Sequence, residues 1–97
     1  MKIIIEKLKD SPISLMRKIG YSFQRKEGEE SSFIRALATG GYPRFHIYCR
    51  MENEKLFLNL HLDQKRETYG NAGRHHGEYN NDGALAAEAE RIENSIK

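Results

Sequence analysis

Two segments in which apolar and polar residues alternate dominate the pattern of the chain. In residues 44–51 every second residue is apolar, and in residues 56–63 four leucines occupy every second position. Alternation with a period of two is typical of a β-strand that buries one face. Only Glu52–Lys55 separates the two segments, so we expect an antiparallel hairpin.

A tight turn at Asn53-Glu54 determines how the two predicted strands pair. It places Met51 opposite Leu56, and in this register all the apolar side chains share one face. Three pairs are then expected on the other face: His46 with His61, Arg44 with Asp63, and Tyr48 with Asn59. Directly opposite side chains lie about 5 Å apart at Cβ. The hairpin therefore predicts a polar cluster with two imidazoles at its centre.

The first half of the chain predicts shorter elements. Three consecutive isoleucines favour a strand at Lys2–Leu8, because β-branched residues disfavour a helix. Ser11 as N-cap and Pro12 at the first helical position predict a helix at Pro12–Ile19, with Gly20 just after its end. The segments that follow are a strand at 21–25, a polar turn at 26–31, a strand or helix at 33–38, and a loop at 39–43. Length and flanking turns favour a strand at 33–38.

The last third of the chain predicts a loop and a helix. Residues 64–83 have no periodicity, and we expect a long polar loop or a lid over the polar cluster. Asn81 or Asp82 is expected to cap a C-terminal helix at 84–96. The apolar stripe of this helix is Leu85, Ala89, Ile92 and Ile96, which leaves Glu88, Glu90 and Glu93 largely on the solvent side.

The order β-α-β-β-β-β-α predicts a single α+β domain over residues 1–97. We expect a mainly antiparallel sheet with two helices packed on one face. A chain of 97 residues with 38% hydrophobic residues is expected to have one thin core.

Composition limits the expected cellular location of the protein more than it limits the function. The net charge of +2 does not by itself indicate nucleic acid. The longest apolar run, Ile3–Ile5, is far shorter than a membrane span, and no signal-peptide pattern is present, so we expect no membrane association. Cys49 is the only cysteine, which excludes an intrachain disulfide and suits a reducing, cytoplasmic location.

The polar cluster contains the candidate catalytic residues His46, His61 and Asp63. Histidine titrates near neutral pH and can exchange protons with a phosphoester, while a carboxylate can orient one imidazole. In this interpretation Arg44 neutralises the developing charge. A solvated sheet face that merely tolerates two histidines is an equally good explanation.

Arginines and aromatic residues surround the cluster and provide a candidate binding surface. Such a combination on a sheet can stack bases and hold phosphates. The candidate substrate-binding residues are Arg44, Tyr48, Arg50, Asn59, Lys65, Arg74 and Tyr79. Phe57 would be exposed on the same face unless the loop covers it.

A divalent metal site is the alternative interpretation. The candidate ligands are His61, Asp63, His76 and Glu78. These residue types suit zinc, manganese or iron, but their spacing matches no metal-binding template. His75 and His76 would point in different directions on an extended chain, so at most one of them is expected to join a site. No other cofactor is expected.

Three stretches, Arg44–Tyr48, Leu60–Lys65 and His76–Tyr79, resemble a family of short bacterial proteins with no known activity. The stretch Lys18–Tyr21, which ends a helix with Gly and an aromatic residue, is similar to HicA-type mRNA interferases. That resemblance implies a double-stranded-RNA-binding-like fold, and it places the catalytic histidine at His46.

Three functions are therefore compatible with the sequence. The first is a small hydrolase-like site that uses histidines or a metal, the second is an RNA-binding module, and the third is a protein-interaction domain. The RNA-directed functions, binding or histidine-dependent cleavage, rank slightly ahead of the others.

Overall fold

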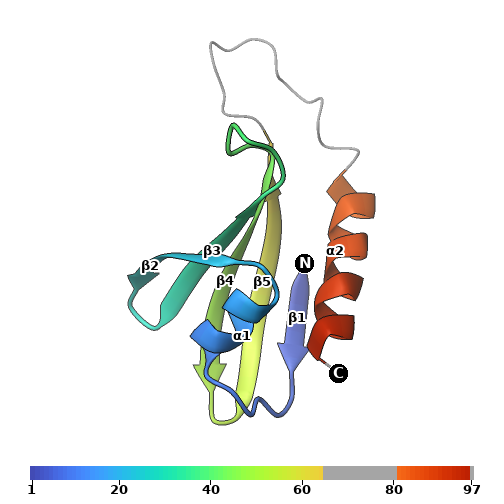
Figure 1. The fold of residues 1–97 in the computed structure, drawn as a ribbon. Helices are drawn as coiled ribbons and strands as arrows, with labels where there is room; N and C mark the ends of the chain where they lie inside the picture. Colours follow the sequence, from blue (N-terminus) through green and yellow to red (C-terminus); the bar gives the residue numbers. More distant parts are fainter. Residues whose placement is uncertain (65–80, 97) are drawn as a thin grey trace.

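The computed structural model describes residues 1–64 and 81–96 (Figure 1). Its elements are β1 (Lys2–Ile5), α1 (Pro12–Lys18), β2 (Ser22–Glu27), β3 (Glu30–Ala36), β4 (Arg44–Glu52), β5 (Lys55–Asp63) and α2 (Asn81–Ile96). The predicted order β-α-β-β-β-β-α and the α+β class are confirmed. Neither described helix is long and apolar enough to span a membrane.

One antiparallel sheet contains all five described strands, in the order β1-β5-β4-β3-β2. The hairpin of β4 and β5 has the predicted register, with His46 opposite His61 and Arg44 opposite Asp63. Asn53 turns the hairpin with a φ of 60°, a left-handed conformation that asparagine tolerates. The alternating pattern of the sequence therefore specifies which side chains lie on each face.

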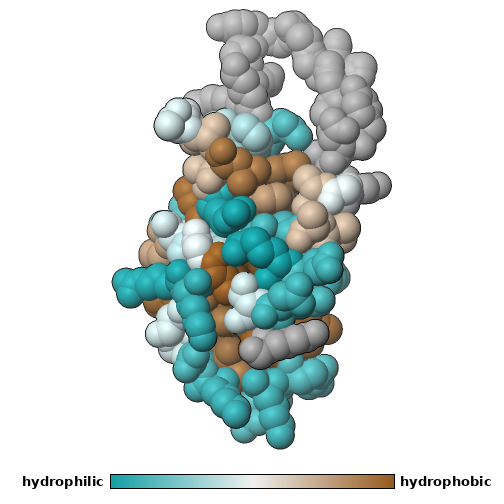
Figure 2. All heavy atoms as spheres, turned by 45° about the vertical axis from the view of Figure 1, so that its right-hand side comes forward, coloured by the Kyte–Doolittle hydropathy of each residue, from teal (hydrophilic) through white to brown (hydrophobic). Residues whose placement is uncertain are grey.

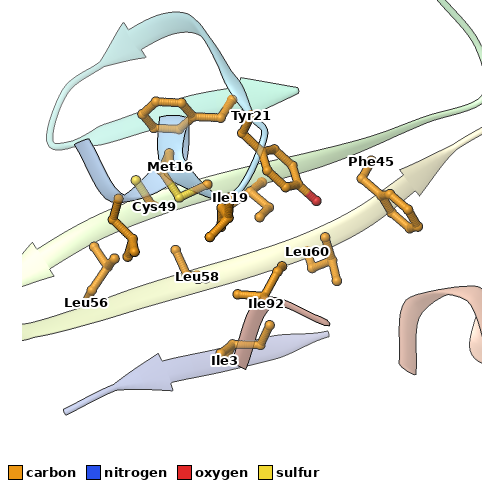
Figure 3. Close-up of a cluster of buried hydrophobic side chains, with 13 residues drawn as sticks. Ile3, Met16, Ile19, Tyr21, Phe45, Cys49, Leu56, Leu58, Leu60 and Ile92 are labelled. Atoms are coloured by element: carbon orange, nitrogen blue, oxygen red, sulfur yellow. The ribbon is translucent and has the colours of Figure 1, made fainter. Parts of the chain in front are cut away.

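The core lies on one face of the sheet, beneath both helices (Figure 3). Leu56, Leu58 and Leu60 of β5 point into it, and α1 adds Met16 while α2 adds Ile92. The remaining buried members are Ile3, Leu15, Ile19, Tyr21, Phe33, Phe45, Ile47 and Cys49. Because both helices pack on this face, neither covers the opposite face of the sheet.

Several predicted boundaries differ from the structure. The first strand ends at Ile5 instead of Leu8. The predicted turn at 26–31 shrinks to Gly28-Glu29, because Glu27 pairs with Glu30 and the flanking residues extend β2 and β3. Of the segment predicted as strand or helix at 33–38, residues 33–36 belong to strand β3, and Leu37 and Ala38 follow its end. Helix α2 begins at Asn81, three residues before the prediction, so Asn81 and Asp82 lie within it.

The predicted solvent exposure of Glu88 is wrong. Its side chain is only 4% exposed and accepts a hydrogen bond from the Tyr21 hydroxyl at 2.7 Å. Arg91, one turn later, donates to both carboxylate oxygens at 2.8 and 2.9 Å, and Arg35 of β3 donates at 3.4 Å. Burial favours the neutral acid, but these donors and charges outweigh it and lower the pKa of Glu88.

This buried network joins α2 to the rest of the domain. Arg91 also donates to the backbone carbonyl of Ile19, at the end of α1, at 2.8 Å. Of the apolar stripe of α2, only Ile92 is fully buried, while Leu85, Ala89 and Ile96 are partly buried. On the side of the molecule where α2 lies, hydrophobic side chains remain visible between hydrophilic ones (Figure 2). Polar contacts at Glu88 thus add to a small apolar contact between α2 and the rest of the domain.

Candidate nucleic-acid interface

The face of the sheet opposite the core, here called the open face, carries the predicted polar cluster. From β4 and β5 it presents Arg44, His46, Tyr48, Arg50, Phe57, Asn59, His61 and Asp63. Strict alternation with the buried positions places all eight on this side. Most of them are partly buried by one another, whereas His61 is exposed.

His46 lies at the centre of the open face and is mostly covered. Its side chain is 13% exposed, and its Nδ1 lies 3.4 Å from Oδ2 of Asp63. The Nε2 atom is fully buried and has no hydrogen-bond partner among the described residues. Burial lowers the pKa of His46 and the charge of Arg44 lowers it further, against the opposing influence of Asp63. The imidazole is therefore neutral at pH 7.

The carboxylate of Asp63 contacts two neighbouring side chains. The same Oδ2 atom that faces His46 accepts a hydrogen bond from Nε of Arg44 at 3.3 Å. The register of the hairpin explains this arrangement, since Arg44 is directly opposite Asp63 and His46 is two residues further along β4. The prediction that a carboxylate orients one imidazole is consistent with this geometry, and the oriented imidazole is that of His46.

Aromatic rings form a continuous cluster on the open face. The centroids of His46 and Tyr48 are 4.5 Å apart, and those of Tyr48 and His61 are 5.6 Å apart in an edge-to-face arrangement. Arg50 lies over the ring of Phe57 at 4.9 Å, so that this ring is only partly exposed. Both cation–π and edge-to-face contacts stabilise ring orientations. Within this cluster His61 is exposed, and Tyr48 and Phe57 are partly exposed.

A small pocket adjoins the cluster, between β2, β3 and β4. Its lining residues are Gln24, Arg25, Glu27, Glu30, Ser32, Arg44, His46 and Tyr48. Five of these come from β2 and β3 and are absent from the sequence-based prediction, which assigned residues 26–31 to a turn. The polar segments on each side of Gly28-Glu29 are the sequence signal from which longer β2 and β3 strands could have been predicted.

The geometry distinguishes the two histidines chemically. The Nδ1 atom of His46 faces Asp63, and its Nε2 atom is buried. His61 is exposed and is the accessible imidazole of the pair. General acid–base catalysis by two histidines requires both to reach the substrate. In this conformation His61 is exposed, whereas the Nε2 atom of His46 is buried.

Several predicted residues lie outside the described part of the chain. These are Lys65, Arg74, Tyr79 and the two candidate metal ligands His76 and Glu78. Within residues 1–64 and 81–96, no group of three His, Cys, Asp or Glu side chains is arranged to hold a metal ion. The predicted site with His61, Asp63, His76 and Glu78 stays a prediction.

Cys49 faces the core side of β4, as the alternation predicts. Burial, and to a smaller extent the charge of Glu30, raise the pKa of its thiol to about 11. A thiol with this pKa is protonated at neutral pH and is a poor nucleophile.

Comparison of the chain with protein-family models, with curated proteins and with solved structures found no match. The open face itself is therefore the basis for assigning a function.

Proposed function

We propose that the protein binds single-stranded RNA on the open face of its sheet. The observation that supports this proposal is the contiguous aromatic cluster of His46, Tyr48 and His61, on a face that neither described helix covers. Bases stack on exposed rings in single-stranded nucleic-acid sites, and each stacked base contributes about 1–3 kcal/mol. Phe57 extends this platform toward the β4–β5 turn.

Arginines beside the rings supply the groups that would hold phosphates. Arg44 pairs with Asp63, and Arg50 pairs with Glu52 at 3.0 Å. Partly exposed ion pairs contribute only about 0–1 kcal/mol each, so a phosphate can displace the carboxylate at small cost. The nearby carboxylates also keep the local charge low, and we therefore expect modest affinity that falls as salt rises.

The different exposure of the two histidines favours RNA binding over RNA cleavage. His46 is mostly covered and faces Asp63, which leaves His61 as the exposed imidazole of the pair. A platform for stacking needs only exposed ring surface, whereas cleavage by a histidine acid–base pair needs both imidazoles within reach of the phosphate. In this proposal His61 acts as a stacking and hydrogen-bonding group.

Fluorescence anisotropy with a labelled 12-nucleotide RNA of mixed sequence tests the proposal. Phe57→Ala and His61→Ala should each weaken binding by about 5- to 100-fold, the loss of one stacking contact. Arg50→Ala should weaken binding and reduce its salt dependence. Arg17→Ala, which removes an exposed arginine from α1 on the other side of the sheet, is the matched control and should change neither.

Two results would contradict the proposal. One is the absence of salt-dependent binding by the wild-type chain, and the other is equal affinity in wild type, Phe57→Ala and His61→Ala. Denaturing gels of the same mixtures report strand scission. Cleavage that His61→Ala abolishes would replace binding with histidine-dependent cleavage as the function of this face.

A further inference from the structure

The pocket beside the aromatic cluster has the dimensions and chemistry of a site for one small polar ring. Its volume is about 110 Å³. Pockets for drug-sized ligands measure roughly 300–1,000 Å³, so this pocket suits a group no larger than a single ring system. Tyr48 and His46 belong both to the pocket and to the ring cluster, so that a strand lying on the open face passes its mouth.

The lining combines hydrogen-bond donors and acceptors in a small space. Gln24 and Arg25 of β2 bring amide and guanidinium N–H groups, while Glu30 of β3 brings carboxylate oxygens. Arg25 lies 3.4 Å from Glu27, whereas Glu30 makes no ion pair within the described residues. A ligand for this lining therefore needs N–H donors for a carboxylate and a carbonyl for the cations and amide.

The local backbone presents these groups toward the pocket. The pairing of β2 with β3 shifts between Phe23 and Arg25, so that Gln24 is the extra residue of a β-bulge. Bulges redirect side chains and often lie beside functional sites. The hydroxyl of Ser32 donates to Oε1 of Gln24 at 3.2 Å, which orients the amide. The amide of Gln24 is thus oriented before a ligand arrives.

We infer that this pocket binds one base of the bound RNA and prefers guanine. Guanine presents two adjacent N–H donors, at N1 and N2, which match the carboxylate of Glu30. Its O6 carbonyl is an acceptor suited to Gln24 and Arg25. Uracil presents carbonyls on both sides of a single N–H, so that at least one carbonyl would face the carboxylate. This inference rests on the proposed function and adds a sequence preference to it.

The preference is measured with four labelled RNA hexanucleotides. Each contains five uridines and one variable internal nucleotide, which is G, A, C or U. Wild type should bind the G-containing strand at least tenfold more tightly than the all-uridine strand. Glu30→Gln should reduce this ratio to about threefold or less. Glu29→Gln, which removes the same charge from the neighbouring turn residue outside the pocket lining, should leave the ratio unchanged.

An NMR titration with GMP and with UMP separates the pocket from the rest of the open face. GMP should shift the backbone amides of Gln24, Glu30 and Ser32, and UMP should shift them far less. Equal affinity for all four strands, or equal ratios in Glu30→Gln and Glu29→Gln, would overturn the guanine site and leave RNA binding intact. If no strand binds while GMP still shifts these amides, the proposed function fails and a base-binding pocket remains.

Discussion

Replacing Glu88 with glutamine removes a buried negative charge and leaves the shape of the side chain almost unchanged. In the native structure one carboxylate oxygen accepts from Tyr21 and Arg91, and the other accepts from Arg91 and Arg35. Glutamine has only one acceptor oxygen, so its NH₂ group must face two donors wherever it is placed. The variant should therefore lose two hydrogen bonds and all of the charge attraction.

The size of the effect follows from the burial of the partners. A hydrogen bond to a charged group contributes about 1.5–3 kcal/mol, and breaking a fully buried ion pair costs about 3–5 kcal/mol. Arg35 and Arg91 keep 29% and 35% of their side chains exposed, so water can replace part of the lost contacts. We expect the free energy of unfolding to fall by about 2–3 kcal/mol. For a domain of this size, that loss lowers Tm by roughly 10–20 °C.

Urea denaturation followed by circular dichroism measures this change, with Glu90→Gln as the matched control. Glu90 is an exposed glutamate on the same helix, and its replacement should alter stability by no more than about 0.5 kcal/mol. If Glu88→Gln is as stable as Glu90→Gln, the buried network does not hold α2 in place, and the reasoning is refuted.

The pH dependence provides a second readout for Glu88. Its pKa in the folded state is lowered from 4.5, so its stabilising effect is fully present above that value. As the pH falls through the lower folded-state pKa, the carboxylate takes up a proton and the effect is lost. The stability gap between wild type and Glu88→Gln should therefore stay constant from pH 7 to about 5 and narrow below 4.5. A gap that persists unchanged at pH 3 would contradict the assignment.

Two further predictions concern buried groups of β4. The folded-state pKa of His46 is lowered, so the unfolded chain binds a proton before the folded chain does as the pH falls below 6.5, and wild type should lose stability in acid. Urea titrations at pH 7.5 and 5.5 should show a smaller loss of stability for His46→Phe than for wild type. Equal losses would refute this prediction. Cys49, with a pKa of about 11, should react with a thiol reagent at pH 8 only after unfolding, as measured by absorbance. Rapid modification of the native protein would contradict this prediction and would show that the core opens at β4.

The β4–β5 hairpin is the part of the fold that local pattern predicts best. Alternation over residues 44–51 and 56–63 sets both strands, their pairing and the composition of each face. A shift of one residue would expose the leucines of β5 and bury His61, so a single register is compatible with the pattern. The meeting of His46 with His61 and of Arg44 with Asp63 follows from that register alone.

Other features depend on contacts between residues far apart in the sequence. Glu88 resembles any exposed helical glutamate until α2 packs against Tyr21 and Arg35, which lie more than fifty positions earlier. The pocket likewise requires β2 and β3 to pair beside β4, and the segment between them resembles a simple polar turn.

The sequence alone thus determined the two faces of the sheet, because the alternation of side chains along a strand is a property of the local backbone. Burial, by contrast, depends on what lies on top of a residue. Only the tertiary structure showed that His46 is covered and oriented by Asp63, while His61 stays in solvent, although the pattern treats the two histidines alike. Their difference arises from position in the sheet. His46 on β4 has β3 and β5 on either side and the carboxylate of Asp63 beside it, whereas the pairing of β1 with β5 ends at Asn59, before His61.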